Sequence, residues 1–187
     1  MAERETLAER LDPNQPRKLR RGPWTVPVAV VTVGGIGYLR PASGTWASAA
    51  AIVVASFLHV TGGFPLVAIA TVLAIGAGFW GCHVVLKDRP GEDPSEIVID
   101  EVAGQWLAFS AVSFGLWHAG VATLPWPAWV APFALFRLFD IWKPGWIGRA
   151  DRRGDGAGVM LDDLIAGVFA AAVAVVLAGI YHGVLAL

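Results

Sequence analysis

Five acidic side chains lie at the ends of apolar segments, where they could act together on a metal ion. Asp100 and Glu101 open one segment, Asp140 closes the next, and Asp162 and Asp163 open the last. Carboxylates at membrane depth are costly and mark functional sites by default. Because converging carboxylates repel one another, a divalent cation between them would remove the conflict. All-oxygen ligands favour a hard ion, Mg2+ above all, which shares its coordination with waters and substrate phosphate.

Two basic side chains near these acids could bind a phosphate group. Arg137 and Asp140 are three residues apart and therefore lie on nearly the same helix face. Arg137 could donate to two phosphate oxygens at once, and Lys143 could supply a point charge just beyond the helix end. The alternative interpretation is a salt bridge between Arg137 and Asp140 within the membrane, with Lys143 reaching the headgroups.

The composition predicts the kind of protein that positions these side chains. The 187 residues are 56% hydrophobic with a mean hydropathy of +0.59, which is typical of a polytopic membrane protein. The first apolar run is short and rich in glycine, so it suits an interfacial or re-entrant segment. We therefore expect an all-α membrane helix bundle with about five spans in residues 26–187, after a flexible cytoplasmic tail in residues 1–25. The apolar runs cover residues 26–39, 45–61, 64–86, 97–118, 121–139 and 162–186.

The distribution of Lys and Arg predicts the orientation in the membrane. Basic residues occur in the tail and in the connections at 87–89 and 143–153, whereas the short connections at 62–63 and 119–120 have none. By the positive-inside rule the basic segments are cytoplasmic, and so are the five acids. An alternative with six spans, which counts residues 26–39, would place basic segments outside.

Other polar residues near the same helix ends extend the predicted site. Thr45 and Ser48 begin the first span, and we expect them to help bind the substrate. The glycine-rich stretch before Asp162 is predicted to be an active-site loop, with Asp151 and Asp155 as secondary acid candidates. The four histidines and one cysteine do not cluster with the acids, which argues against a zinc site.

Four blocks of the sequence carry a family resemblance. They are GTWAS at 44–48, DPSEIVIDEVAGQW at 93–106, FRLFDIWKP at 136–144 and MLDDLIAG at 160–167. They resemble the phosphatidylglycerophosphatase A family of bacterial magnesium-dependent membrane phosphatases. Together they cover most of residues 40–187, and they occur in the family's order. Ser43 and Ala47 depart from the Pro and Gly expected in the first block, but the acids are intact.

The resemblance implies hydrolysis of phosphatidylglycerophosphate to phosphatidylglycerol and phosphate at the cytoplasmic face of the inner membrane. It assigns the five acids to catalysis and to binding Mg2+, and Arg137 and Lys143 to binding phosphate. A carboxylate could instead be the general base or a covalent nucleophile.

Several other functions would use a similar set of residues. A phosphatase acting on another lipid phosphate, such as phosphatidic acid, would need the same acids and metal. A small ion or proton transporter could also use these acids, although transport favours charges near the bilayer midplane. The sequence lacks the Asp-x-x-Asp-Gly-x-x-Ala-Arg pattern of CDP-alcohol phosphotransferases and the Lys-Arg-Pro block of histidine-type lipid phosphatases. Ion flux without phosphate release would identify a transporter.

Overall fold

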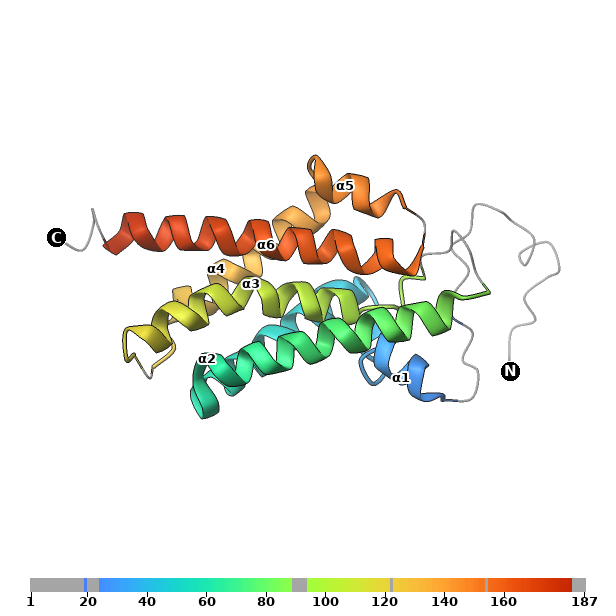
Figure 1. Cartoon of the computed structure of the whole chain (residues 1–187), viewed down its shortest axis with the longest axis horizontal. Coiled ribbons are helices and arrows are strands. Elements are labelled where there is room, and N and C mark those ends of the chain that lie inside the picture. Colours follow the sequence, from blue (N-terminus) through green and yellow to red (C-terminus); the bar gives the residue numbers. More distant parts are fainter. Residues whose placement is uncertain (1–18, 20–23, 89–93, 122, 154, 183–187) are drawn as a thin grey trace.

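The computed structural model is all-α, as the sequence predicts. It describes residues 19, 24–88, 94–121, 123–153 and 155–182, so most of the predicted tail, residues 1–18 and 20–23, lies outside the described residues. The long helices run along the long axis of the molecule, and α3 lies against both α2 and α6 (Figure 1). The helices are α1 (Val26–Val31), the short 3-10 helix η2 (Ile36–Tyr38), α2 (Ser43–Leu86), α3 (Ile99–His118), α4 (Trp126–Trp142), α5 (Trp146–Asp151) and α6 (Gly156–Ile180).

Helix α2 is a hairpin of two helical arms. Its 44 residues are interrupted at Gly63, whose φ of 65° and ψ of −163° are accessible essentially only to glycine. Ala51 and Ala74 belong to one core cluster, and Ile52 and Val67 belong to another. A straight helix would place Ala51 and Ala74 about 34 Å apart. The chain therefore folds back at Gly63, and Figure 1 shows the two arms returning to the same end of the molecule.

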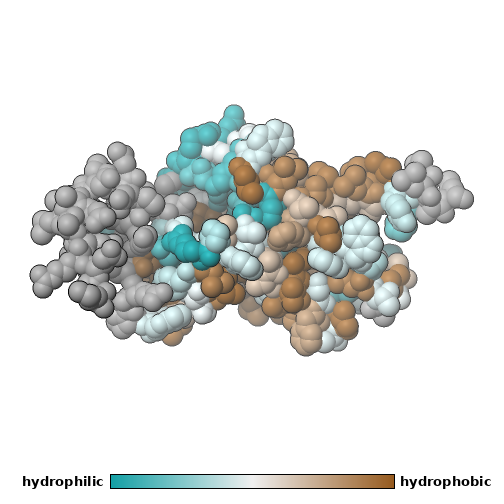
Figure 2. All heavy atoms as spheres, turned by 180° about the vertical axis from the view of Figure 1, so that it is seen from behind, coloured by the Kyte–Doolittle hydropathy of each residue, from teal (hydrophilic) through white to brown (hydrophobic). Residues whose placement is uncertain are grey.

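The structure supports a membrane protein, but fewer helices than the five predicted spans meet the length and hydropathy expected of a membrane span. Among the described residues, two helices are long and apolar enough to cross a membrane, α2 and α6. Helix α4 has only 17 residues, and α3 begins with two acids that lower its hydropathy. Helix α1 has six residues, or about 9 Å, which is too short for a hydrocarbon core of about 30 Å. On the face that Figure 2 shows, apolar side chains predominate over one half, and polar side chains gather towards the other half.

Helices α3 and α6 touch through two glycines. A Cβ on Gly104 would lie 2.6 Å from the backbone oxygen of Asp163, and a Cβ on Gly167 would lie 2.5 Å from the backbone oxygen of Gly104. Any side chain at either position would therefore push the two backbones apart. This close approach, typical of membrane helix pairs, brings the acids of α6 beside the acids of α3.

Candidate active site

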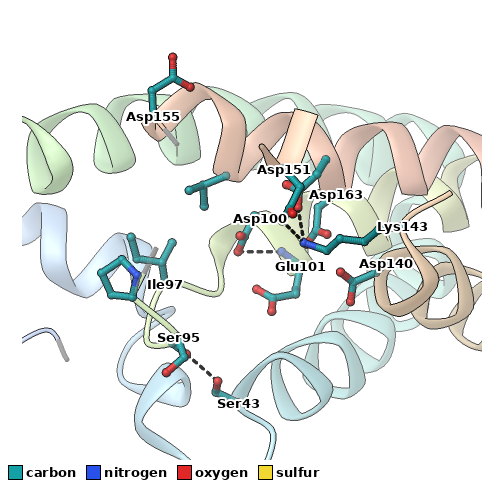
Figure 3. A pocket seen from close by; sticks show the side chains of 13 residues that line it. Ser43, Ser95, Ile97, Asp100, Glu101, Asp140, Lys143, Asp151, Asp155 and Asp163 are labelled. Atoms are coloured by element: carbon teal, nitrogen blue, oxygen red, sulfur yellow. Dashed lines mark hydrogen bonds and ion pairs between the residues drawn. The ribbon is translucent and has the colours of Figure 1, made fainter. Parts of the chain in front are cut away.

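A cavity of about 160 Å³ opens where the polar ends of five helices meet. All five candidate acids and Lys143 line it. The close-up shows Asp100, Glu101, Asp140 and Asp163 converging from α3, α4 and α6 (Figure 3). The segment before α3 and the first residue of α2 complete the wall. The lining residues are Ser43, Pro94, Ser95, Ile97, Asp100, Glu101, Asp140, Lys143, Asp151, Asp155, Val159, Asp162 and Asp163.

Three of the acids form a compact group suited to a metal ion. Asp100, Glu101 and Asp163 each offer a carboxylate oxygen, and these oxygens lie within 4.8 Å of one another. Asp100 and Glu101 occupy the first turn of α3, where the helix dipole favours negative charge. Asp163 is only 3% exposed, and Glu101 Oε2 is buried without a hydrogen-bond partner in the part of the chain that the structure describes. Such an all-oxygen group fits a hard divalent cation, which would relieve the repulsion between the carboxylates.

The other two acids are paired with the two candidate phosphate ligands. Arg137 Nη1 donates to Asp140 Oδ2 over 2.6 Å, so the salt bridge considered for the sequence is present. Lys143 Nζ donates to Asp162 Oδ2 over 2.8 Å and also to Asp151. The five acids therefore divide into two sets. Asp140 and Asp162 each form an ion pair with a basic side chain, whereas the group of three forms no ion pair among the described residues.

Lys143 is a fixed positive charge at the cavity wall. It follows α4 in a left-handed conformation, with φ 47° and ψ 51°, which is unusual for a residue other than glycine. Burial lowers the pKa of its ammonium group, but the hydrogen bonds to Asp151 and Asp162 more than offset this, so the pKa is raised. Lys143 therefore remains protonated at neutral pH and is suited to bind an anion.

The secondary acid candidate Asp155 has a local structural role. Its Oδ1 accepts a hydrogen bond of 2.7 Å from the backbone N–H of Gly158, which caps the start of α6. Arg153 donates to the same carboxylate, and mainly this bond lowers the pKa of Asp155. Figure 3 shows Asp155 apart from the other acids. Its role as the N-cap of α6 is therefore sufficient to explain an acid at this position.

Thr45 and Ser48 lie in different surroundings. Thr45 is exposed, and its Oγ1 accepts a hydrogen bond of 3.2 Å from Arg137 Nη2. Ser48 is fully buried, its hydroxyl donates to the backbone oxygen of Gly44 over 2.9 Å, and it is not among the cavity-lining residues. The geometry therefore links Thr45, but not Ser48, to the charged residues.

An ion pair that sequence analysis missed holds the segment before α3. Glu96 is only 2% exposed, and its Oε1 accepts from Arg40 Nη2 over 3.2 Å. Its Oε2 accepts a hydrogen bond of 3.2 Å from the backbone N–H of Leu19, and Ser43 Oγ donates to the backbone oxygen of Ser95 over 2.6 Å. These bonds fix the approach to the first turn of α3.

Gln105 is a second residue that sequence analysis did not assign. It lies one helical turn after Glu101 on α3 and is fully buried, yet neither Oε1 nor Nε2 has a hydrogen-bond partner among the described residues. An unsatisfied buried amide of this kind is costly. A polar residue inside an otherwise apolar run is the signal that could have identified it.

A family match and two curated relatives indicate one family. Residues 29–178 match the family described as phosphatidylglycerophosphatase A. A phosphatidylglycerophosphatase A of Haemophilus influenzae is 34% identical over 146 residues, which are 77% of this chain and 84% of the relative. That of Escherichia coli K12 is 34% identical over 155 residues, or 81% of each chain. A Bacteroides thetaiotaomicron protein, assigned provisionally as a phosphatidylinositol-3-phosphatase, is 35% identical over 152 residues, or 79% and 90% of the two chains. No solved structure matches significantly.

Proposed function

The chain belongs to the phosphatidylglycerophosphatase A family of phosphoric monoester hydrolases, and from this premise we propose its substrate, metal and orientation. It removes the terminal phosphate of phosphatidylglycerophosphate and leaves phosphatidylglycerol in the membrane. The observation that carries this proposal is the cavity in which three close carboxylates lie beside Lys143, with Arg137 paired to Asp140 on the cavity wall. Such a site can neutralise a phosphate group by a metal and by fixed cations together.

Asp100, Glu101 and Asp163 are the residues that would hold Mg2+. When bound there, Mg2+ would neutralise charge on the phosphoryl group and assist attack by water. Lys143 would bind a phosphate oxygen with the charge that it keeps at neutral pH. Asp162 accepts from Lys143 through Oδ2, whereas its Oδ1 has no hydrogen-bond partner among the described residues. Oδ1 is therefore the candidate acceptor for a proton from the attacking water.

The proposed topology has five crossings in residues 26–187, with the acids on the cytoplasmic side. The crossings are the two arms of α2, α3, α4 and α6, and α1 lies at the interface. Three observations support this arrangement: α2 folds back at Gly63, the connections at 62–63 and 119–120 have no Lys or Arg, and the cavity joins the opposite helix ends. The tail in residues 1–25 would then be cytoplasmic.

A related lipid phosphate is the second candidate substrate. The Bacteroides relative, whose provisional name specifies a phosphatidylinositol phosphate, shares as much identity as the two phosphatidylglycerophosphatases. Both kinds of lipid carry a phosphodiester next to the diacylglycerol and a phosphomonoester at the far end of the headgroup. The cavity chemistry suits the monoester in either lipid, so the headgroup between the phosphates would decide the preference.

Phosphate release by the purified protein in detergent tests the proposal. We expect release from phosphatidylglycerophosphate that requires Mg2+, stops with a chelator and exceeds release from phosphatidic acid or phosphatidylinositol 3-phosphate. Release from these other lipids at an equal rate would still identify a lipid phosphatase, but one that accepts several lipid phosphates. Absence of release from all three by folded protein would refute the proposal, and ion flux in proteoliposomes would then favour a transporter.

The contact between α3 and α6 should control the same activity. We expect Gly104→Ala to reduce turnover at least about tenfold and to lower the melting temperature by several degrees, because the new Cβ separates Asp163 from the acids of α3. Gly115→Ala on the same helix is the matched control, since its Cβ would meet no atom within 4 Å. Equal turnover in the two variants would show that the glycine contact does not set the spacing of the acids.

A further inference from the structure

The outer face of α4 carries an apolar stripe with one charged residue in it. Ala134, Arg137, Leu138, Ile141 and Trp142 line a shallow open hollow, and their spacing of three and four residues places them on one helix face. Leu138, Ile141 and Trp142 are 53%, 72% and 69% exposed. Apolar side chains so exposed on a membrane protein suit contact with acyl chains.

Arg137 connects this stripe to the acidic cavity. Its Nη1 donates to Asp140, which lines the cavity, and its Nη2 donates to the exposed Thr45 at the start of α2. A guanidinium has five N–H groups, and these two bonds occupy two of them. Nε is buried and has no hydrogen-bond partner among the described residues, and each Nη keeps a second N–H that could bind a further anion. Arg137 therefore lies between an apolar surface and a phosphate-binding cavity.

We propose that Arg137 binds the phosphodiester of the lipid substrate, with the acyl chains along the stripe on α4 and the terminal phosphomonoester in the acidic cavity. This inference rests on the proposed function and refines the expectation that Arg137 and Lys143 hold the same phosphate. Phosphatidylglycerophosphate carries two phosphate groups joined by a short glycerol bridge. The diester must stay next to the acyl chains, and Arg137 is the cation that borders an apolar surface. Lys143, beside the group of three acids, is left for the monoester.

The division of the two cations has a consequence for substrate choice. A lipid that has only a monoester, such as phosphatidic acid, can occupy the cavity or the Arg137 position, but not both. A lipid with a diester and a terminal monoester uses both cations, and its diester fixes how far the headgroup reaches. Arg137 is then a specificity-determining residue.

Binding of the reaction products separates the two positions without turnover. Phosphatidylglycerol has the diester but no monoester, and inorganic phosphate resembles the monoester alone. We would measure the dissociation constants of short-chain phosphatidylglycerol and of phosphate by calorimetry, with the full chain in maltoside detergent that contains no phospholipid. Mg2+ is present throughout, and short-chain diacylglycerol serves as the lipid without a diester.

We expect Arg137→Gln to weaken phosphatidylglycerol binding about tenfold or more, as for a lost charged hydrogen bond, and to change phosphate binding less than twofold. Lys143→Asn should show the opposite pattern. Arg149→Gln is the matched control, because Arg149 is exposed on α5 and does not line either hollow. Diacylglycerol binding should not depend on Arg137. Arg137→Lys retains the charge, and we expect it to weaken phosphatidylglycerol binding by a smaller factor.

The inference would be overturned if Arg137→Gln left phosphatidylglycerol binding unchanged, or if it weakened phosphate binding as much. If Arg137→Gln does not fold, unchanged phosphatidylglycerol binding by Arg137→Lys would count equally against it. Failure of the proposed function looks different: the wild-type protein would bind phosphatidylglycerol through Arg137 but release no phosphate from phosphatidylglycerophosphate.

Discussion

Asp163→Asn should reduce phosphate release at least about a thousandfold and leave the protein folded. The side chain is 3% exposed, so a replacement of the same size is needed to avoid a packing defect. Asn keeps the shape of Asp but has no negative charge. Because Asp163 lies with Asp100 and Glu101 in the compact group, the variant loses one of three carboxylates that would hold Mg2+.

The thermal stability of Asp163→Asn separates loss of a metal ligand from general damage. Without divalent cations the variant should melt at or above the wild-type temperature, because two carboxylates repel less than three. Added Mg2+ should raise the melting temperature of the wild-type protein, since a ligand that binds only the folded state stabilises it, but not that of the variant.

Asp88→Asn is the control for Asp163→Asn. Asp88 is an exposed acid just after α2 and does not line the cavity. The turnover of Asp88→Asn and the rise of its melting temperature with Mg2+ should therefore match those of the wild type. Asp163 would be removed from the proposed metal ligands if Asp163→Asn released phosphate normally, or if Mg2+ stabilised that variant as it stabilises the wild type.

The fold could be predicted from sequence wherever local composition determines it. The apolar runs at 45–61 and 64–86 correspond to the two arms of α2, and the break between them contains Gly63, the residue that reverses the chain. Each apolar run reverses the direction of the chain, and counting the runs predicted that the acids lie at the same end of the bundle. The number of spans did not follow as directly, because the acids that form the site also lower the hydropathy of α3.

Which acids group together could not be predicted from sequence. Asp162 and Asp163 are adjacent, yet one pairs with Lys143 and the other joins Asp100 and Glu101. This difference depends on the rotation of α6 about its axis, which the contact of its glycine with Gly104 fixes. The order of charges along the chain contains no such information.

The ion pair between Arg40 and Glu96 was missed for a related reason. The two residues are 56 positions apart, and neither lies in a helix whose periodicity would assign it a face. Their pairing depends on how the segment before α2 lies against the segment before α3. Contacts between irregular segments leave no periodic signal in a sequence.

Lys143→Asn is expected to lower phosphate release about a hundredfold or more, because it removes the cation proposed to bind the transferred phosphate. Lys143 has φ 47° and ψ 51°, and Asn is the residue after glycine that adopts this left-handed conformation most readily. The backbone at the end of α4 should therefore be retained. The loss then measures the ammonium group, which donates to Asp151 and Asp162.

Two further variants show whether charge or geometry matters at Lys143. Lys143→Arg keeps the charge but replaces a compact ammonium with a planar group, so we expect it to recover only part of the lost rate. Lys87→Asn removes an exposed cation at the end of α2, away from the cavity lining, and should leave the rate unchanged. Equal rates in Lys143→Asn and the wild type would mean that Lys143 only neutralises its two acid partners.

The pH profile tests the same assignment in another way. Hydrogen bonds to Asp151 and Asp162 raise the pKa of Lys143 despite its burial, so the wild-type rate should show no loss from Lys143 deprotonation between pH 7 and about pH 10. A fall in rate within this range that is missing in Lys143→Arg would mean that Lys143 loses its proton there and does not act as a fixed charge. A group held protonated by two carboxylates acts by its charge, which is the property that a phosphate site requires.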